Sequence, residues 1–72
     1  MVAEVPDHVL EIARKVADYE RRSDECARLA SHEFRLASLA RDPSIARYHH
    51  SNGSSYVRQA EKYNRMAEAL FS

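Results

Sequence analysis

Apolar residues between positions 7 and 42 recur with the spacing of an α-helix, and neither Gly nor Pro interrupts this stretch. Pro6 and Asp7 suit the start of a helix, because proline is pre-shaped for the first turn and a carboxylate favours the positive helix end. Asp42 stands before Pro43, which pushes it out of the helical region. We therefore expect a long helix over residues 7–41. At 100° per residue, one apolar stripe on it comprises Val9, Ile12, Ala13, Val16, Tyr19, Cys26, Ala27, Ala30, Phe34 and Ala37.

A second apolar row follows the carboxyl-terminal half of this helix, on the side opposite to the first stripe. Leu29, Leu36 and Leu39 keep the helical spacing, and His32 lies between them. Such spacing is typical of a helix that docks into a groove on a partner. We call Leu29, His32, Leu36 and Leu39 the ridge, and we treat it as a candidate protein-interaction site.

The segment from 43 to 71 is also predicted to be helical, with Asp42 as its N-cap and Pro43 in its first turn. Small residues recur every seven positions at Ala46, Gly53, Ala60 and Ala67, which lets another helix approach closely. The run 51–55 (SNGSS) consists of poor helix formers, although the seven-residue repeat passes through it. Two outcomes stay open here: one continuous helix, or a break that leaves a short helix before the run and a longer one after it.

Together these patterns predict an all-α antiparallel helical hairpin within a single domain, residues 1–72, with residues 1–5 disordered. A hairpin of two helices can bury only one apolar face of the first helix, so we expect two copies to pair into a four-helix bundle, a coiled-coil homodimer. The alternative is that a third helix, 54–71, folds back over the ridge. The predicted core comprises Val9, Ile12, Val16, Tyr19, Ala30, Phe34, Ile45, Tyr56, Tyr63, Met66 and Leu70.

Charge is balanced, with 11 Lys and Arg against 11 Asp and Glu in 72 residues, so no strong overall field attracts nucleic acid or an anionic membrane. Acidic groups are in slight excess before Pro43 and basic groups after it, which suits two segments that lie against each other. The frequent use of Arg and Ala is typical of GC-rich bacterial or phage genomes. No secretory signal or membrane-spanning run is recognisable, and one free cysteine fits the reducing cytoplasm.

Candidate catalytic and metal-binding residues lack the patterns that such chemistry needs. Cys26 lies on the Ala-rich stripe, where a thiol is buried and inert. His32 begins a sequence like that of zinc proteases, but Arg35 stands at the second ligand position. His49 is expected to lie at the edge of the core, bonded to a neighbour. We therefore predict no catalytic residue, no metal and no cofactor.

Two functions remain after these exclusions. We predict a non-enzymatic interaction module that associates with itself and acts as a regulator, an inhibitor or an accessory protein. The ridge is its docking surface for a protein target if self-pairing does not use it. The alternative is a nucleic-acid-binding dimer, since a basic face on the second helix could enter a major groove. That face comprises Arg47, Arg58, Lys62 and Arg65.

Overall fold

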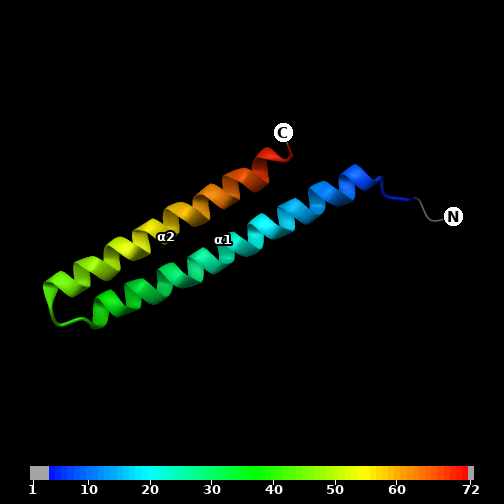
Figure 1. Cartoon of the computed structure of the whole chain (residues 1–72). Helices are drawn as coiled ribbons and strands as arrows, with labels where there is room; N and C mark the ends of the chain where they lie inside the picture. Colours follow the sequence, from blue (N-terminus) through cyan, green and yellow to red (C-terminus); the bar gives the residue numbers. More distant parts are fainter. Residues whose placement is uncertain (1–3, 72) are drawn as a thin grey trace.

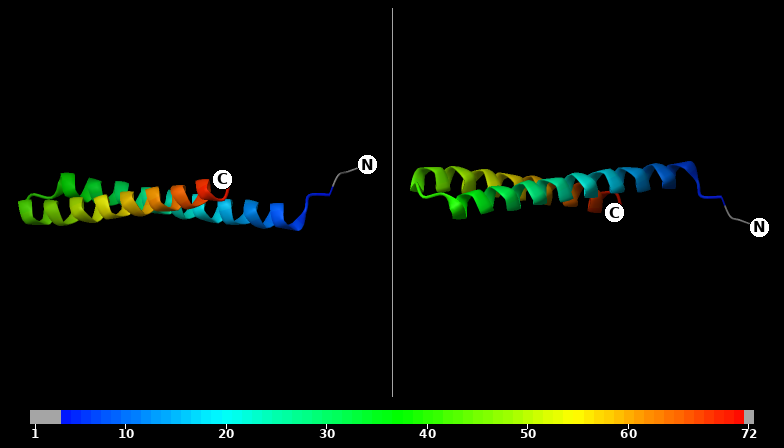
Figure 2. Two further views of the ribbon diagram at one scale, coloured as in Figure 1. Left: turned by 90° about the horizontal axis from the view of Figure 1, so that it is seen from above. Right: turned by 90° about the horizontal axis from the view of Figure 1, so that it is seen from below.

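The computed structural model describes residues 4–71 as two long helices, α1 (Asp7–Leu39) and α2 (Pro43–Ala69). They run antiparallel, side by side, with both chain ends at the same end of the molecule (Figure 1). Viewed from above and below, the pair forms one thin layer (Figure 2), and its extents are 64 × 22 × 10 Å. The predicted all-α hairpin is confirmed.

Both helices begin where the sequence indicates and end slightly early. The Asp42 carboxylate caps α2 by accepting a hydrogen bond from the Ser44 amide at 2.8 Å. Helix α1 ends at Leu39 rather than at residue 41, because Ala40 is already extended and the chain needs residues 40–42 to reverse direction. Helix α2 ends at Ala69 rather than at residue 71, because the last two predicted residues form a turn. In this turn the Leu70 amide donates a hydrogen bond to the Ala67 carbonyl.

The chain before α1 is extended at Pro6, whose ψ of 145° makes it the N-cap rather than the first helical residue. Asp7 therefore opens the helix. The disorder predicted for residues 1–5 falls largely outside the described residues, and Glu4 and Val5 are exposed and lie outside the helix.

Helix α2 continues through the run 51–55 without a break, so the fold-back of a separate third helix does not occur. Gly53 is buried against α1 and has an ordinary negative φ. Contact with α1 along the whole repeat stabilises the helical conformation of residues 51–55, although these residues are poor helix formers. Long helices depend more on packing than on propensity.

The contact between the helices is a seam of mostly small residues. The buried positions are Val16, Ser23, Cys26 and Ala30 on α1, and Gly53, Ala60 and Ala67 on α2. The Ser23 hydroxyl donates to the Ala60 carbonyl at 3.1 Å, which sets these two positions opposite each other. Equal steps of seven in opposite directions then place Ala30 opposite Gly53. A side chain can reach the backbone of the facing helix only because both surfaces are small.

This seam hides little surface. Among residues 4–71, no side chain is completely buried. The chain exposes 5901 Å², whereas a folded monomer of 8.3 kDa ordinarily exposes about 4,600 Å². The radius of gyration is 17.6 Å, against about 11 Å for a compact domain of this length. A single hairpin is therefore an unusually open structure.

The predicted core is only partly enclosed. Val16 and Ala30 are buried, but Val9 and Ile45 are exposed, which corrects their assignment. Val9 belongs to the first turn of α1, and this end of α1 extends past the end of α2 (Figure 1). Ile45 lies beside the seam rather than in it. The remaining predicted core residues are half-buried, namely Ile12, Tyr19, Phe34, Tyr56, Tyr63, Met66 and Leu70.

Candidate interaction surface

Two rows of side chains flank the seam on one side of the hairpin. On α1 the row includes Arg22 and, at steps of seven, Leu29 and Leu36; on α2 it includes Gln59 and, two steps earlier, Ile45. The Arg22 guanidinium lies 5.8 Å from the centre of the Tyr63 ring, and Cys26 Sγ lies 3.9 Å from Gln59 Oε1. These contacts across the seam place both rows on the same side.

Near the connection between the helices, this side is apolar. We call Leu29, Leu36, Leu39, Ile45 and Tyr48 the loop-end apolar face. Leu36 is half-buried, whereas Leu29 is 46% exposed, Leu39 71%, Ile45 50% and Tyr48 63%. Leu36 and Ile45 each stand one position before an alanine of the seven-residue rows, Ala37 and Ala46, so both lie on this side of the seam at a similar level. The face joins three ridge residues on α1 to two residues that only the hairpin brings beside them.

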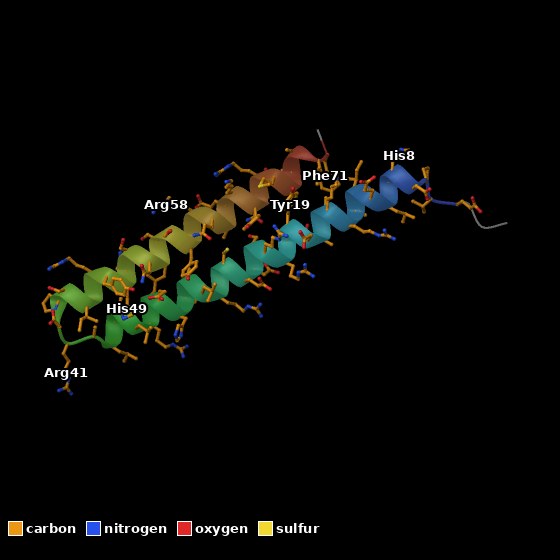
Figure 3. The ribbon with its side chains drawn as sticks, in the orientation of Figure 1. His8, Tyr19, Arg41, His49, Arg58 and Phe71 are labelled. Carbon is orange, nitrogen blue, oxygen red and sulfur yellow. The ribbon has the colours of Figure 1, made fainter. Side chains whose placement is uncertain are left out.

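A polar pair lies at the centre of this face. His49 Nδ1 of α2 and Glu33 Oε2 of α1 are 2.6 Å apart, and both side chains are about four-fifths buried. The His49 ring also meets the Tyr48 ring edge-on, with centroids 5.2 Å apart. Figure 3 shows His49 directed between the helices. The imidazole donates to the carboxylate, so His49 Nδ1 and Glu33 Oε2 satisfy each other within the single hairpin.

The prediction that His49 bonds to a neighbour at the core edge is confirmed, but its partner was missed. Sequence spacing gives no direct link between Glu33 and His49, which are 16 residues apart. The seam register was the available signal, since both residues stand three positions after small residues of the repeat, Ala30 and Ala46.

The other side of the seam holds an aromatic contact that the sequence did not reveal. The Phe34 ring lies against Gly53, so a Cβ at position 53 would be only 2.6 Å from Phe34 Cε1. The same ring packs against His50, with centroids 5.3 Å apart. Gly53 therefore serves as a close-contact position for an aromatic ring, in addition to its place in the small-residue repeat.

Two other residues singled out in the sequence, His32 and Cys26, differ in their exposure to solvent. His32 of the ridge is exposed, and it lies with Arg28, Ser31 and Arg35 along the outer surface of α1. Within the ridge, Leu29 and Leu36 are turned about 100° from the seam row of Ser23 and Ala30, whereas His32 and Leu39 are turned about 160° and so lie nearly opposite to it. Cys26 is a buried free thiol, as predicted.

The proposed nucleic-acid residues do not converge. All four, Arg47, Arg58, Lys62 and Arg65, are exposed, and Figure 3 shows Arg58 directed away from α1. They are strung over 18 residues, about 27 Å of helix, with Glu61 and Glu68 on the same helix. The result is a sparse row of cations, not a concentrated basic patch.

A smaller apolar groove lies at the open end of the hairpin, on the opposite side of the seam. Phe71, 74% exposed, lies beside Val9, Ile12, Ala13 and Val16 of α1 where α2 ends. Figure 3 shows Phe71 close to α1 at this end. Glu20 lines the same groove and adds a carboxylate to its margin.

Neither a metal-ligand cluster nor a membrane span is found among residues 4–71. No three His, Cys, Asp or Glu side chains come together there, and neither helix has an apolar stretch able to cross a bilayer. Comparisons with protein-family models, curated proteins and solved structures give no significant match.

Proposed function

We propose that this protein is a non-enzymatic interaction module that associates with itself through the loop-end apolar face, so that two hairpins form a four-helix bundle. The proposal places it in the cytoplasm, where a free cysteine stays reduced, as a regulator or accessory protein that presents its remaining surface to a protein target. The observation that carries it is the gathering of five large apolar side chains, four of them at least 46% exposed, on one end of a two-helix structure.

The surplus of exposed surface supports association. The chain exposes 5901 Å², about 1,300 Å² more than a monomer of its mass usually does. A stable protein interface buries about 800 Å² on each partner. An interface of that size removes about 800 of the 1,300 Å² by which the hairpin exceeds an ordinary folded monomer.

The angle between the contact faces of α1 supports a bundle. In a square array of four helices, each helix meets two neighbours on faces about 90° apart. Around the α1 axis, the ridge row of Leu29 and Leu36 is about 100° from the seam row of Ser23 and Ala30, and the row of His32 and Leu39 continues from it toward the far side. Helix α1 is thus shaped to contact α2 on one face and a helix of a second copy on the other.

Sedimentation velocity over a range of concentrations tests the proposal. We expect a dimer that becomes monomeric on Leu39→Glu, because this substitution puts a charge into the apolar face while disturbing no contact in the single hairpin, where Leu39 is 71% exposed. Leu10→Glu is the matched control, since Leu10 is 42% exposed and lies at the open end. A monomer at every concentration contradicts self-association, and equal disruption by both variants contradicts the assigned face.

The nucleic-acid alternative has a separate test. Phosphate contacts make binding weaken steeply as salt rises. A mobility-shift measurement at two salt concentrations, with wild type and Arg58→Ala, would show a salt-sensitive shift that the variant reduces. No shift at low salt removes this alternative and leaves the interaction module.

A further inference from the structure

We propose that the second copy binds antiparallel and overlaps only at the loop ends, so that two hairpins meet tip to tip and their open ends project in opposite directions. This rests on the proposed self-association and adds its geometry. The argument comes from the ridge face of α1, which continues toward the open end with a different chemistry.

The ridge is the apolar half of a longer seven-residue repeat on α1. Its two rows, followed from residue 8 to residue 39, change from charged to apolar near residue 29. The first row comprises His8, Lys15, Arg22, Leu29 and Leu36. The second row comprises Glu11, Asp18, Glu25, His32 and Leu39.

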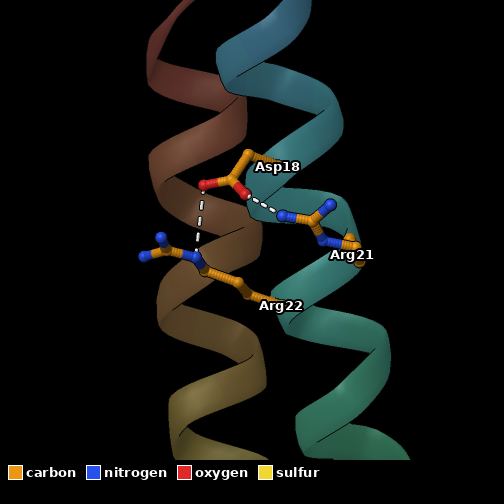
Figure 4. Close-up of polar contacts among 3 residues, drawn as sticks. All are labelled: Asp18, Arg21 and Arg22. Carbon is orange, nitrogen blue, oxygen red and sulfur yellow. Dashed lines mark hydrogen bonds and ion pairs between the residues drawn. The ribbon is translucent and has the colours of Figure 1, made fainter.

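The charged half is already paired within α1 and faces water. Lys15 Nζ lies 3.7 Å from Glu11 Oε1, and Arg22 Nε lies 3.2 Å from Asp18 Oδ2. Asp18 also bonds to Arg21 (Figure 4). Lys15, Arg21 and Arg22 are each more than half exposed. Covering these groups with another helix removes them from water without supplying better partners, which is costly.

A parallel pairing of the two α1 helices is disfavoured by this pattern. A two-fold axis along the helices sets identical residues opposite each other. Leucine would meet leucine at the loop end, but Arg22 would face Arg22 and Asp18 would face Asp18 of the second copy. Like charges at close range repel, and the existing ion pairs would be disturbed.

An antiparallel pairing along the full length is also disfavoured. In that register the apolar half of one helix covers the charged half of the other, so that Leu29 lies over Asp18 and Leu36 over Glu11 of the second copy. The leucines remain poorly buried, and the carboxylates lose water for an apolar neighbour.

A short antiparallel overlap buries the apolar half of the ridge face of α1 without covering its charged half. When the two-fold axis passes near residue 34, Leu29 meets Leu39 of the second copy and Leu36 meets its His32. Ile45 and Tyr48 lie on the same side of the hairpin and join the contact, while the charged half of each α1 stays in water. This register covers the loop-end apolar face and leaves the open-end groove of both copies free.

Pulsed electron-spin distance measurements on the full-length chain test the register. In a Cys26→Ala background, spin labels are placed at Arg14→Cys or Arg35→Cys, two exposed positions on the outer face of α1. Tip-to-tip overlap places the two labels at position 14 about 60 Å apart, and the two at position 35 within about 20 Å. Full antiparallel overlap gives about 30 Å for both, and parallel pairing gives a short distance for both.

Small-angle scattering of the unlabelled chain provides a second measurement that avoids the substitutions. One hairpin is 64 Å long, so a tip-to-tip dimer has a maximum dimension of about 100 Å, whereas either side-by-side dimer stays close to the length of one hairpin. A dimer with the short dimension or with a short distance at position 14 overturns this register while leaving self-association intact. A monomer in sedimentation overturns both.

Discussion

Helix α1 has two contact faces built from different kinds of residue. The seam toward α2 is lined by Ser23, Cys26 and Ala30, which are small and buried, whereas the ridge carries Leu29, Leu36 and Leu39, which are large and half-buried or exposed. Small residues let two helices approach closely and lock one register, but they remove little apolar area from water. Large residues can supply that area only when something covers them. The hairpin thus separates the residues that specify its shape from those that can drive association.

The largest expected loss of stability comes from placing a large apolar side chain, like those of the ridge, in the seam. Ala30→Leu forces a large side chain between the helices at a position that is 3% exposed, and we expect it to lower the free energy of unfolding by about 2–3 kcal/mol. Ala27→Leu is the control, because Ala27 lies on the same helix but is exposed; it should change stability by less than about 0.5 kcal/mol. Chemical denaturation of both variants gives the comparison. Equal loss in both would show that the close fit of the seam is unimportant.

Removing an aromatic side chain at the edge of the seam should cause an intermediate loss of stability. Tyr63 stacks near Tyr19, with ring centroids 6.2 Å apart, and lies under Arg22. Because Tyr63 is half-buried, Tyr63→Ala should cost about 1–2 kcal/mol, less than a fully buried aromatic ring. Tyr63→Phe keeps the ring and should retain nearly all of the stability. Thermal melts followed by circular dichroism measure both, and an unchanged melt for Tyr63→Ala would remove Tyr63 from the packing.

The contact between Phe34 and Gly53 predicts that the effect of Gly53→Ala on stability changes sign when the Phe34 ring is removed. Gly53→Ala alone should lower stability by about 1 kcal/mol, because the added Cβ meets the Phe34 ring and the loss outweighs the better helix propensity. In a Phe34→Ala background the same substitution should raise stability by up to about 1 kcal/mol, since only the propensity gain remains. The double-mutant cycle is read from denaturation curves. Additive effects would mean that the ring moves aside freely.

The smallest effect is expected at the charged half of α1. Asp18→Asn removes ion pairs to Arg21 and Arg22 that are largely exposed, so the cost should stay below about 1 kcal/mol and shrink further at high salt. Asp24→Asn provides a control at an exposed acidic residue of the same helix. A loss of several kcal/mol on Asp18→Asn would indicate that this region is buried in the assembled protein, which contradicts the tip-to-tip register.

Much of the fold was predictable because the signals for it are local. The helix start at Asp7, the Asp42 cap and the turn before Pro43 depend on neighbouring residues, and the predicted positions agree with the structure to within two residues. The run 51–55 was ambiguous because its local preference opposes the repeat around Gly53. Packing against α1 resolved it, and no property of the five residues by themselves could.

Only part of the candidate interaction surface could be predicted from the sequence. The ridge followed from periodicity on one helix, but its union with Ile45 and Tyr48 depends on the register between the helices. The same register pairs Glu33 with His49 and places Phe34 over Gly53. Helical spacing predicts Val9 and Ile45 in the core, because it places them on the apolar faces of their helices. They are exposed because one lies past the end of α2 and the other beside the seam.

By itself, the sequence determined that the chain forms two helices, where they begin and turn, and that one of them carries more apolar faces than a single neighbour can cover. These properties follow from caps, proline and residue spacing along one helix. Only the tertiary structure decided which residues meet across the seam, which aromatic ring occupies the space beside the glycine, and which apolar side chains stay exposed. Those outcomes depend on how far one helix slides along the other, and that distance is set by the close fit of small side chains.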